Sequence, residues 1–310
     1  MRSVIRALVY RAPREAERCP ACGSTHLEDL DVLQMRGRRF GFVSLCDACG
    51  LVFSNPPPTE EALAQFYAPA GTWNETHAAD PGAPKKSRGG GRWLSQFDPI
   101  RNELSVASPP PGARVLDYGC GTGGDLDVLQ ERGWETFGIE PAVDQAFPRH
   151  RRLDVIPAEP TFDLVLLNHV LEHVTRPLAL LSQLARACRV SGYLLVGVPR
   201  FDTLPIHRDY SYVINGRAHV TAYTRGCLLG LLARSGWDAV ADTDQRGSTR
   251  LRVLARRVAE PPPVPDSPAT EARAALRAYY RDIGDRRTLH RLGMLRLLAR
   301  YQMGARRKAR

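Results

Sequence analysis

The middle of the chain alternates short apolar runs with polar or glycine-rich turns, a spacing typical of an α/β protein. The runs Val115–Leu116 and Thr136–Ile139 predict two strands, and each strand ends beside an acid, Asp117 or Glu140. The run Leu164–Leu167 is apolar on both faces, as expected of a central parallel strand covered by helices on both sides. This pattern predicts the first half of a nucleotide-type parallel sheet.

The second half of the sheet is predicted from the residues that follow. Its elements are a helix ending near Cys188, a strand over Gly192–Pro199, a helix over Arg225–Arg234, and a hairpin of Asp238–Thr243 and Thr249–Arg257. Thr224 suits the N-cap of that last helix and Gly236 suits its C′ position. The predicted fold class is therefore α/β, with a mostly parallel sheet, an antiparallel last strand and helices on both faces.

A loop with four glycines follows the first predicted strand, at residues 119–124. Glycine lets a backbone turn tightly and lets a bulky ligand lie against main-chain amides. The order of residues differs from the dinucleotide fingerprint G-x-G-x-x-G, and no Gly-Lys-Ser/Thr follows, which excludes a P-loop. Asp117 would repel a pyrophosphate but can hold an ammonium group, and Glu140 can accept hydrogen bonds from both hydroxyls of a ribose.

At this loop the sequence resembles the class I S-adenosylmethionine-dependent methyltransferases, whose first motif is E/D-x-G-x-G-x-G. The resemblance implies a Rossmann-like methyltransferase sheet, with Asp117, Gly119 and Gly121 lining the methionine end of the cofactor and Glu140 binding its ribose. The remaining residues that we assign to the cofactor site are Tyr118, Cys120, Pro141, Asn168 and His169.

Two later phrases also resemble small-molecule members of that family. Residues 162–174 fit F-D-x-V-x-x-x-x-V-L-E-H-V, and residues 219–224 fit H-x-x-x-Y/F-T. Asn168 and His169 would stand at the carboxyl end of a strand, the edge at which open α/β sheets bind ligands. Histidine suits deprotonation of a hydroxyl near neutral pH. The candidates for the base are His169, His173, His207 and His219, with Tyr223 as an orienting hydroxyl, and we expect His219 or His173 to be the base. A magnesium-assisted route through Glu172 and His173 is the alternative.

The adenine side of the predicted cofactor site is the least regular part of the resemblance. Only 21 residues separate Glu140 from Phe162, and four prolines interrupt them. Other family members usually place a helix, a third strand and an adenine-facing acid there. We expect the third strand at Leu153–Ile156, with Asp154 or Glu159 as the acid.

A second constellation precedes the glycine loop. Cys19 and Cys22 form one C-x-x-C-G pair, and Cys46 and Cys49 form another, with 23 residues between the pairs. Two such knuckles at this separation predict a tetrahedral Cys₄ site for structural Zn²⁺, with no vacant position for catalysis. The segment Arg38–Leu45 predicts a strand leading into the second knuckle.

Composition narrows the class of protein further. The chain has 310 residues, 43% of them hydrophobic, and its formal net charge is +10. This length supports about two domains. No apolar run approaches the ~20 residues of a membrane-spanning helix, and the first 18 residues do not resemble a secretion signal. Thiolate ligation and an odd number of remaining cysteines favour a reducing cytoplasm, so we expect a cytoplasmic protein.

The charge is concentrated in the last 42 residues, which hold twelve Lys or Arg and three Asp or Glu after the proline-rich linker Pro261–Pro268. This tail would contact an anionic membrane surface, an acidic partner or nucleic acid. The alternative, which we favour, is a C-terminal helical pair packed on the catalytic domain with a solvated basic face. Residues 69–91 are a linker or a lid over the active site.

The predicted organisation is a zinc-ribbon module at 1–68, a linker or lid with a lead-in helix at 69–108, a methyltransferase domain at 109–260, and the linker and basic helices at 261–310. The phrase around the second knuckle resembles enzymes of sugar and secondary-metabolite methylation, which implies a small-molecule acceptor. Asn55–Pro58 resembles the motif of amine methylases but follows the knuckle rather than the fourth strand, so we interpret it as a turn. The alternatives are an RNA methyltransferase and a non-catalytic zinc-ribbon scaffold; nucleic acid is less favoured because no basic stripe with interleaved aromatics is evident.

Overall fold

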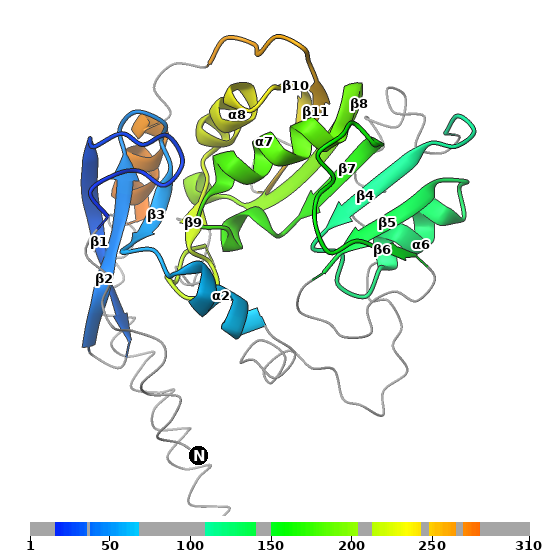
Figure 1. The fold of residues 1–310 in the computed structure, drawn as a ribbon. Coiled ribbons are helices and arrows are strands. Elements are labelled where there is room, and N and C mark those ends of the chain that lie inside the picture. Colours follow the sequence, from blue (N-terminus) through cyan, green and yellow to red (C-terminus); the bar gives the residue numbers. More distant parts are fainter. Residues whose placement is uncertain are drawn as a thin grey trace, which may run out of the picture.

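The computed structural model describes residues 16–35, 38–67, 109–140, 150–203, 213–242, 248–264 and 269–279. These residues build two sheets that share one hydrophobic core (Figure 1). Pro141, His207, the predicted lid at residues 69–91 and the tail beyond residue 279 lie outside the described residues.

The larger sheet has seven strands in the order β10-β11-β8-β7-β4-β5-β6. Their bounds are β4 Arg114–Tyr118, β5 Glu135–Ile139, β6 Arg151–Arg152, β7 Phe162–Asn168, β8 Cys188–Pro199, β10 Trp237–Asp242 and β11 Arg250–Arg257. Strands β6, β5, β4, β7 and β8 are parallel to one another, whereas β11 pairs antiparallel with both β8 and β10. This arrangement confirms the predicted Rossmann-like sheet with antiparallel strands at one edge.

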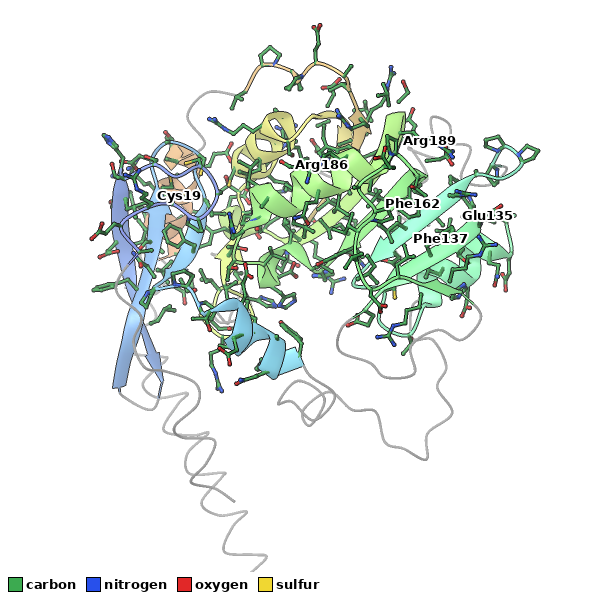
Figure 2. The ribbon with its side chains drawn as sticks, in the orientation of Figure 1. Cys19, Glu135, Phe137, Phe162, Arg186 and Arg189 are labelled. Carbon is green, nitrogen blue, oxygen red and sulfur yellow. The ribbon has the colours of Figure 1, made fainter. Side chains whose placement is uncertain are left out.

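Both faces of this sheet are covered, as the apolar run in β7 predicts. Leu164 and Leu166 pack with Leu126 and Leu129 of α6 (Gly124–Gln130) on one face. The alternate residues of the strands pack against α7 (Pro177–Ala187) and α8 (Arg225–Arg234) on the other face. On that second face Phe137 and Phe162 meet edge to face with ring centroids 5.4 Å apart (Figure 2).

The smaller sheet is antiparallel, in the order β1-β2-β3-β9. It consists of β1 (Leu27–Met35), β2 (Arg38–Cys46), β3 (Val52–Asn55) and β9 (Thr221–Ala222). Residues 16–67, called the N-terminal module below, supply the first three strands and α2 (Glu60–Tyr67), whereas β9 comes from the far end of the chain. Strand β9 therefore links the two sheets, because it belongs to the smaller sheet but comes from a part of the chain that follows β8 of the larger sheet.

Most of the predicted elements are confirmed. The helix Arg225–Arg234 has its predicted N-cap, because Thr224 Oγ1 accepts a hydrogen bond from the Cys227 N–H at 3.2 Å. Gly236 has the predicted positive φ, 86°. Asn55–Pro58 is a turn that leads from β3 toward α2, and the Asn55–Pro56 peptide is cis.

One expectation about local structure was wrong. The third strand of the parallel set is Arg151–Arg152 rather than Leu153–Ile156, because Phe137 and Gly138 of β5 pair with those two arginines. The described part of the tail, a helix over residues 269–279, packs on the smaller sheet and also contacts the catalytic domain, because its Glu271 accepts a hydrogen bond from the Gly226 N–H of α8 at 2.8 Å. Ala269, Ala272 and Leu276 join the core formed by Val43, Leu45 and Val52.

Within the described ranges, the structure contains no helix with the length and apolar character needed to cross a membrane.

Candidate functional site

The glycine loop joins β4 to α6 at the carboxyl edge of the larger sheet. Gly119 and Gly121 have φ values of 79° and 53°. The Gly119 N–H donates to the Ile139 carbonyl at 2.8 Å, and the Gly121 N–H donates to Glu140 Oε2 at 2.9 Å. Glu140, the acid predicted to bind the ribose, is therefore hydrogen-bonded to the glycine loop.

Gly119 is required for a second reason, which is its approach to the turn after β7. A Cβ at position 119 would lie 2.3 Å from Cγ2 of Val170, whereas a Cβ at Gly121 would meet nothing within 4 Å. The glycine loop and the end of β7 are therefore in direct contact. Gly119 makes that contact possible.

Asp117 is the buried acid of the loop, with 4% of its surface exposed. Burial raises the pKa of its carboxyl well above the ordinary value, and the negative charges of Asp125 and Glu140 raise it further. A buried acid among like charges favours a cationic ligand, because a nearby positive charge would stabilise its ionised form. This environment fits an ammonium group.

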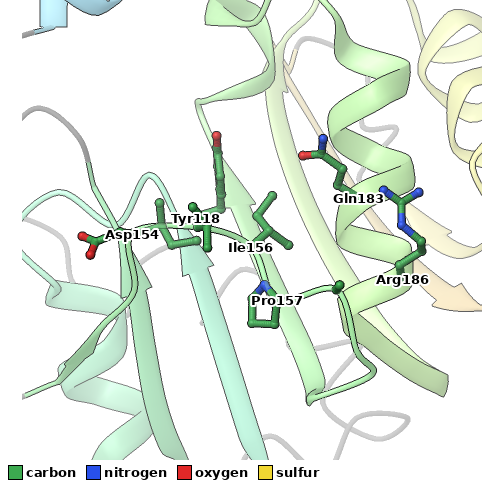
Figure 3. A pocket seen from close by; sticks show the side chains of 9 residues that line it. Tyr118, Asp154, Ile156, Pro157, Gln183 and Arg186 are labelled. Carbon is green, nitrogen blue, oxygen red and sulfur yellow. The ribbon is translucent and has the colours of Figure 1, made fainter.

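A cavity of 420 Å³ opens beside the ends of β4 and β5 (Figure 3). Tyr118 and Ile139 line it from the sheet, Asp154 and Ile156 from the segment after β6, and Arg186 from α7. The Asp154 side chain is 92% exposed, and its Oδ1 lies 3.8 Å from Nε of Arg152. Asp154 thus lines the same cavity as Ile139, the residue that precedes Glu140.

The carboxyl end of β7 carries a histidine in an unusual backbone conformation. His169 has a φ of 55°, a region that costs energy for a residue with a Cβ and that recurs at functional sites. Its N–H donates to the Gly197 carbonyl at 2.8 Å. Its Nδ1 lies 3.0 Å from Oε1 of Glu172, a residue of the short 3₁₀ turn η1 (Leu171–His173). Asn168 Oδ1, just before it, is buried and has no hydrogen-bond partner.

Glu172 is the centre of a histidine cluster. It is 1% exposed, and its Oε2 has no hydrogen-bond partner. His173 Nε2 lies 3.9 Å from Glu172 Oε1, and the ring of His219 meets that of His173 with centroids 4.8 Å apart. Burial alone would raise the Glu172 pKa, but the hydrogen bond from His169 and the charges of His173, His169 and His219 lower it below the ordinary value.

The structure therefore brings the three predicted histidines, His169, His173 and His219, to one carboxylate. Tyr223 was expected to orient a ligand with its hydroxyl. That hydroxyl is fully buried and donates to the Leu171 carbonyl at 2.9 Å, and Thr221 Oγ1 donates to the same carbonyl at 3.0 Å. Since the Val220 N–H also donates to the Glu172 carbonyl at 2.8 Å, the segment around β9 holds the η1 turn in place.

One member of the cluster was missed by the sequence. The hydroxyl of Tyr67, the last residue of α2, lies 2.7 Å from Nδ1 of His173. The two residues are 106 positions apart, and no motif includes Tyr67. Its place in the cluster comes from the way the N-terminal module sits on the larger sheet.

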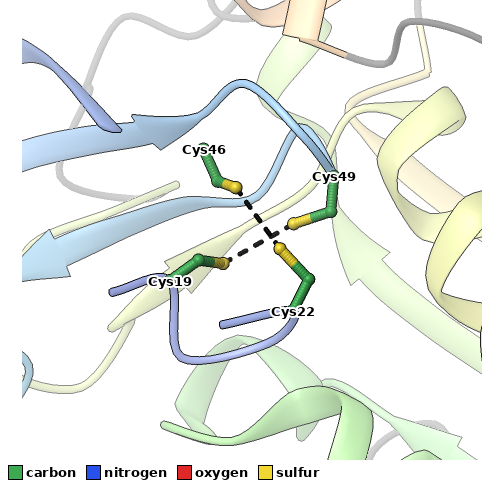
Figure 4. A group of neighbouring side chains, drawn as sticks. All are labelled: Cys19, Cys22, Cys46 and Cys49. Carbon is green, nitrogen blue, oxygen red and sulfur yellow. Dashed lines mark hydrogen bonds between the residues drawn. The ribbon is translucent and has the colours of Figure 1, made fainter. Parts of the chain in front are cut away.

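The four cysteines of the two knuckles converge on one point (Figure 4). Their sulfur atoms lie within 4.8 Å of one another, with 3.6 Å between Cys19 and Cys49 and 3.5 Å between Cys22 and Cys46. The glycine after each knuckle has positive φ, 75° at Gly23 and 71° at Gly50. The N–H of each glycine donates to the carbonyl of the first cysteine of its knuckle.

Comparison with known proteins agrees with this geometry. Residues 92–242 match the family model described as a methyltransferase domain. The domain around the seven-stranded sheet has the Rossmann-like methyltransferase fold. Among the residues discussed above, Asp117, His169, Glu172 and His219 lie within the matched range of this methyltransferase domain, whereas Tyr67 and the four cysteines precede it.

Individual relatives cover the chain only in part. A protein of 37.1 kDa in transposon TN4556 of Streptomyces fradiae is 31% identical over 44% of this chain and 45% of its own. A ubiquinone biosynthesis O-methyltransferase of Xylella fastidiosa is 28% identical over 38% of this chain and 52% of its own. The chain thus spans about half the length of these relatives. A solved SAM dependent methyltransferase from Archaeoglobus fulgidus has 16% identity and a TM-score of 0.43, covering 60% of this chain and 98% of its own.

Proposed function

We propose that this chain transfers the methyl group of S-adenosylmethionine to a hydroxyl, or secondarily a carbon, of a small polar or sugar-like acceptor. The observation that carries the proposal is the buried Glu172 carboxylate with three imidazoles, placed against the glycine loop of a methyltransferase domain. The printed name of the Xylella relative, an O-methyltransferase of ubiquinone biosynthesis, supports a small-molecule acceptor.

The residues around the glycine loop fit the cofactor. Asp117, a buried acid without a positive charge among those that shift its pKa, suits the ammonium of the methionine end. Glu140 suits the ribose, and the cavity lined by Tyr118, Ile139 and Asp154 suits the adenosine side. When bound, this cofactor supplies a methyl group that its sulfonium has already made electrophilic. The protein then has to orient the acceptor and remove its proton.

His169 has the best geometry for the base among the three histidines. An ionised carboxylate only accepts hydrogen bonds, so the contact with Glu172 places a proton on His169 Nδ1 and leaves Nε2 to take a proton from the acceptor. The His169 side chain is 32% exposed, which leaves it accessible from the sheet edge. Glu172 would hold the ring in this tautomer and stabilise its protonated form. This geometry favours His169, whereas the sequence favoured His219 or His173 as the base.

We also propose that Cys19, Cys22, Cys46 and Cys49 hold one structural zinc ion. Four sulfurs at about 2.3 Å from a tetrahedral Zn²⁺ lie about 3.8 Å apart, close to the 3.5 and 3.6 Å separations found here. Elemental analysis of the purified chain is expected to give one zinc per molecule, lost in the Cys22→Ser variant. Zinc-free protein with all seven thiols titratable would contradict the assignment.

The proposed reaction is tested with S-adenosylmethionine carrying a tritiated methyl group, offered a metabolite extract and total RNA in parallel. We expect label in a small molecule with the wild-type chain. The His169→Asn variant should lose the transfer ~10²–10⁴-fold while binding the cofactor normally. Asparagine is chosen because it tolerates the positive φ of this position.

The matched control is His150→Asn. His150, like His169, lies next to a carboxylate, with Nε2 3.0 Å from Asp127 Oδ1 and Nδ1 2.8 Å from Thr136 Oγ1. Unlike His169 it is buried, and it directly precedes β6, at the end of the parallel strands opposite their carboxyl edge. Its loss should lower stability and leave the transfer per folded molecule unchanged. Label mainly in RNA would replace the small-molecule proposal by the RNA alternative. Label in neither pool, despite tight cofactor binding, would favour a scaffold or a protein substrate.

A further inference from the structure

The N-terminal module delivers one side chain to the histidine cluster of the methyltransferase domain. That side chain is Tyr67, at the end of α2. The helix starts at a defined point, because Thr59 Oγ1 accepts a hydrogen bond from the Ala62 N–H at 3.1 Å. In Figure 1, α2 lies between the smaller sheet and the carboxyl ends of the parallel strands. The helix end is thus placed at the functional edge of the larger sheet.

Tyr67 holds His173 by both its hydroxyl and its ring. Besides the 2.7 Å contact between the hydroxyl and Nδ1, the two rings meet edge to face with centroids 5.7 Å apart. The Phe66 ring also meets the Tyr67 ring edge to face, with centroids 5.0 Å apart. The His219 ring lies against His173 as well, at 4.8 Å. His173 is therefore packed between a ring of the N-terminal module and a ring from the segment that precedes β9.

The partners of His173 define which of its nitrogens carries a fixed proton. Nδ1 lies 2.9 Å from the carbonyl oxygen of Ala218, which can only accept a hydrogen bond. Nδ1 is therefore protonated, and the Tyr67 oxygen shares that proton as a second acceptor. The other nitrogen, Nε2, faces Glu172 Oε1 at 3.9 Å. Tyr67 and Ala218 together fix which nitrogen faces the carboxylate.

Tyr67 keeps its own proton near neutral pH. Burial raises the pKa of its hydroxyl above the ordinary value, and the charges of Glu172 and Glu140 raise it further. A phenol in this environment is a hydrogen-bonding group and not a base.

We propose that Tyr67 is a positioning residue of the methyltransferase site, acting through His173 on Glu172 and thereby on the His169 base. Through Tyr67 the N-terminal module is a part of the active site. The proposal depends on the proposed function only for the expected effect of Tyr67 on turnover. Residues 92–242 alone would lack this contact.

The first arm of the test needs no acceptor. Nitrogen-15 spectra of the histidine rings are compared between the full-length wild type and the Tyr67→Phe variant, which keeps the ring and removes the hydroxyl. The Nδ1 resonance of His173 is expected to move, while the signals of His150 stay in place. Tyr193→Phe removes the hydroxyl of another partly buried tyrosine, on β8, and is expected to leave His173 unchanged.

The second arm is a double-mutant cycle on turnover, with Tyr67→Phe, His173→Gln and the double variant. A hydrogen bond of this kind contributes about 0.5–1.5 kcal/mol, so Tyr67→Phe should lower kcat roughly 3- to 10-fold with unchanged cofactor affinity. In the His173→Gln background the same change should have less than about a twofold effect, because residues that act through one another are not additive.

The outcomes separate this proposal from the proposed reaction. An unmoved His173 resonance in Tyr67→Phe, or equal effects of that change in both backgrounds, would overturn the positioning role. A shifted resonance in a chain that transfers no methyl group to any acceptor would support the contact and overturn the proposed function alone.

Discussion

Two buried carboxylates stand at the same edge of the larger sheet, and their surroundings act on them in opposite directions. Asp117, in the glycine loop, is surrounded by like charges, and its pKa is raised by burial and by Asp125 and Glu140. Glu172, in the η1 turn, is even less exposed, yet its pKa is lowered because His169, His173 and His219 outweigh the effect of burial. Glu172 has histidines of the protein beside it, whereas no basic side chain is among the groups that shift the pKa of Asp117.

The difference indicates what each region is for. A buried acid among negative charges is costly until a cation arrives, so the glycine loop is suited to a ligand that brings a positive charge. A buried acid with histidines around it is suited to hold those histidines in one orientation and to stabilise their protonated forms. In the proposed mechanism the glycine loop therefore binds the cofactor, and the histidine cluster around Glu172 removes the proton of the acceptor.

The largest effect is expected from neutralising Glu172, the carboxylate that holds the proposed base. Glu172→Gln keeps the size of the side chain but removes the charge that holds His169, so methyl transfer should fall ~10²–10⁴-fold. Cofactor affinity, measured by calorimetry, should stay the same because the glycine loop is untouched. A variant that lost affinity and rate together would show that Glu172 serves binding instead.

The second effect tests Asp117, the carboxylate that we assign to cofactor binding. Asp117→Asn removes the charge that we assign to the ammonium group, so the dissociation constant of the cofactor should rise about 10- to 100-fold, the usual effect of a charged hydrogen bond. The same change removes a buried charge, so the midpoint of thermal unfolding without cofactor should rise at neutral pH. Unchanged affinity in this variant would remove Asp117 from the cofactor site.

A smaller effect tests the contact between the two regions. Gly119→Ala costs about 1–2 kcal/mol for its left-handed backbone and also forces a methyl group into Val170. Gly121→Ala meets no neighbour and should cost the backbone term alone. Truncating Val170 to alanine in the Gly119→Ala chain should recover part of the lost stability. Equal unfolding midpoints for the two glycine variants would mean that the loop and the η1 turn do not touch.

The smallest effect is on how stability depends on pH. Glu172 has a pKa below its ordinary value of 4.5 in the folded chain, so its contribution to stability is complete above pH 4.5 and is lost as the pH falls through the lower folded value. Asp117 acts in the opposite sense, because its raised pKa lowers stability as the pH rises above its ordinary value of 3.8. Chemical unfolding across acidic pH should therefore show a flatter curve for Glu172→Gln below pH 4.5 than for the wild type.

Much of the architecture could be predicted because the signals are local. Apolar runs predicted the central strands β4, β5 and β7, and the bounds of helix α8 were predicted to the residue with the help of its cap. The position of the third strand was missed because β6 has only two residues and both are exposed arginines, so no apolar run marks it. The contact of helix 269–279 with the smaller sheet was not predicted, because an alanine-rich stripe does not indicate which sheet it will cover.

By itself the sequence determined the glycine loop, the acids beside it, the paired knuckles and the three histidines, because each is a short motif whose meaning depends on residue type and spacing. Only the tertiary structure decided that the histidines share Glu172, that Tyr223 supports the turn instead of a ligand, and that Tyr67 reaches His173. These contacts join segments brought together by the packing of one sheet on another and by the strand β9 that links them. Spacing along the chain carries no information about such distances, since they are set by the shared core.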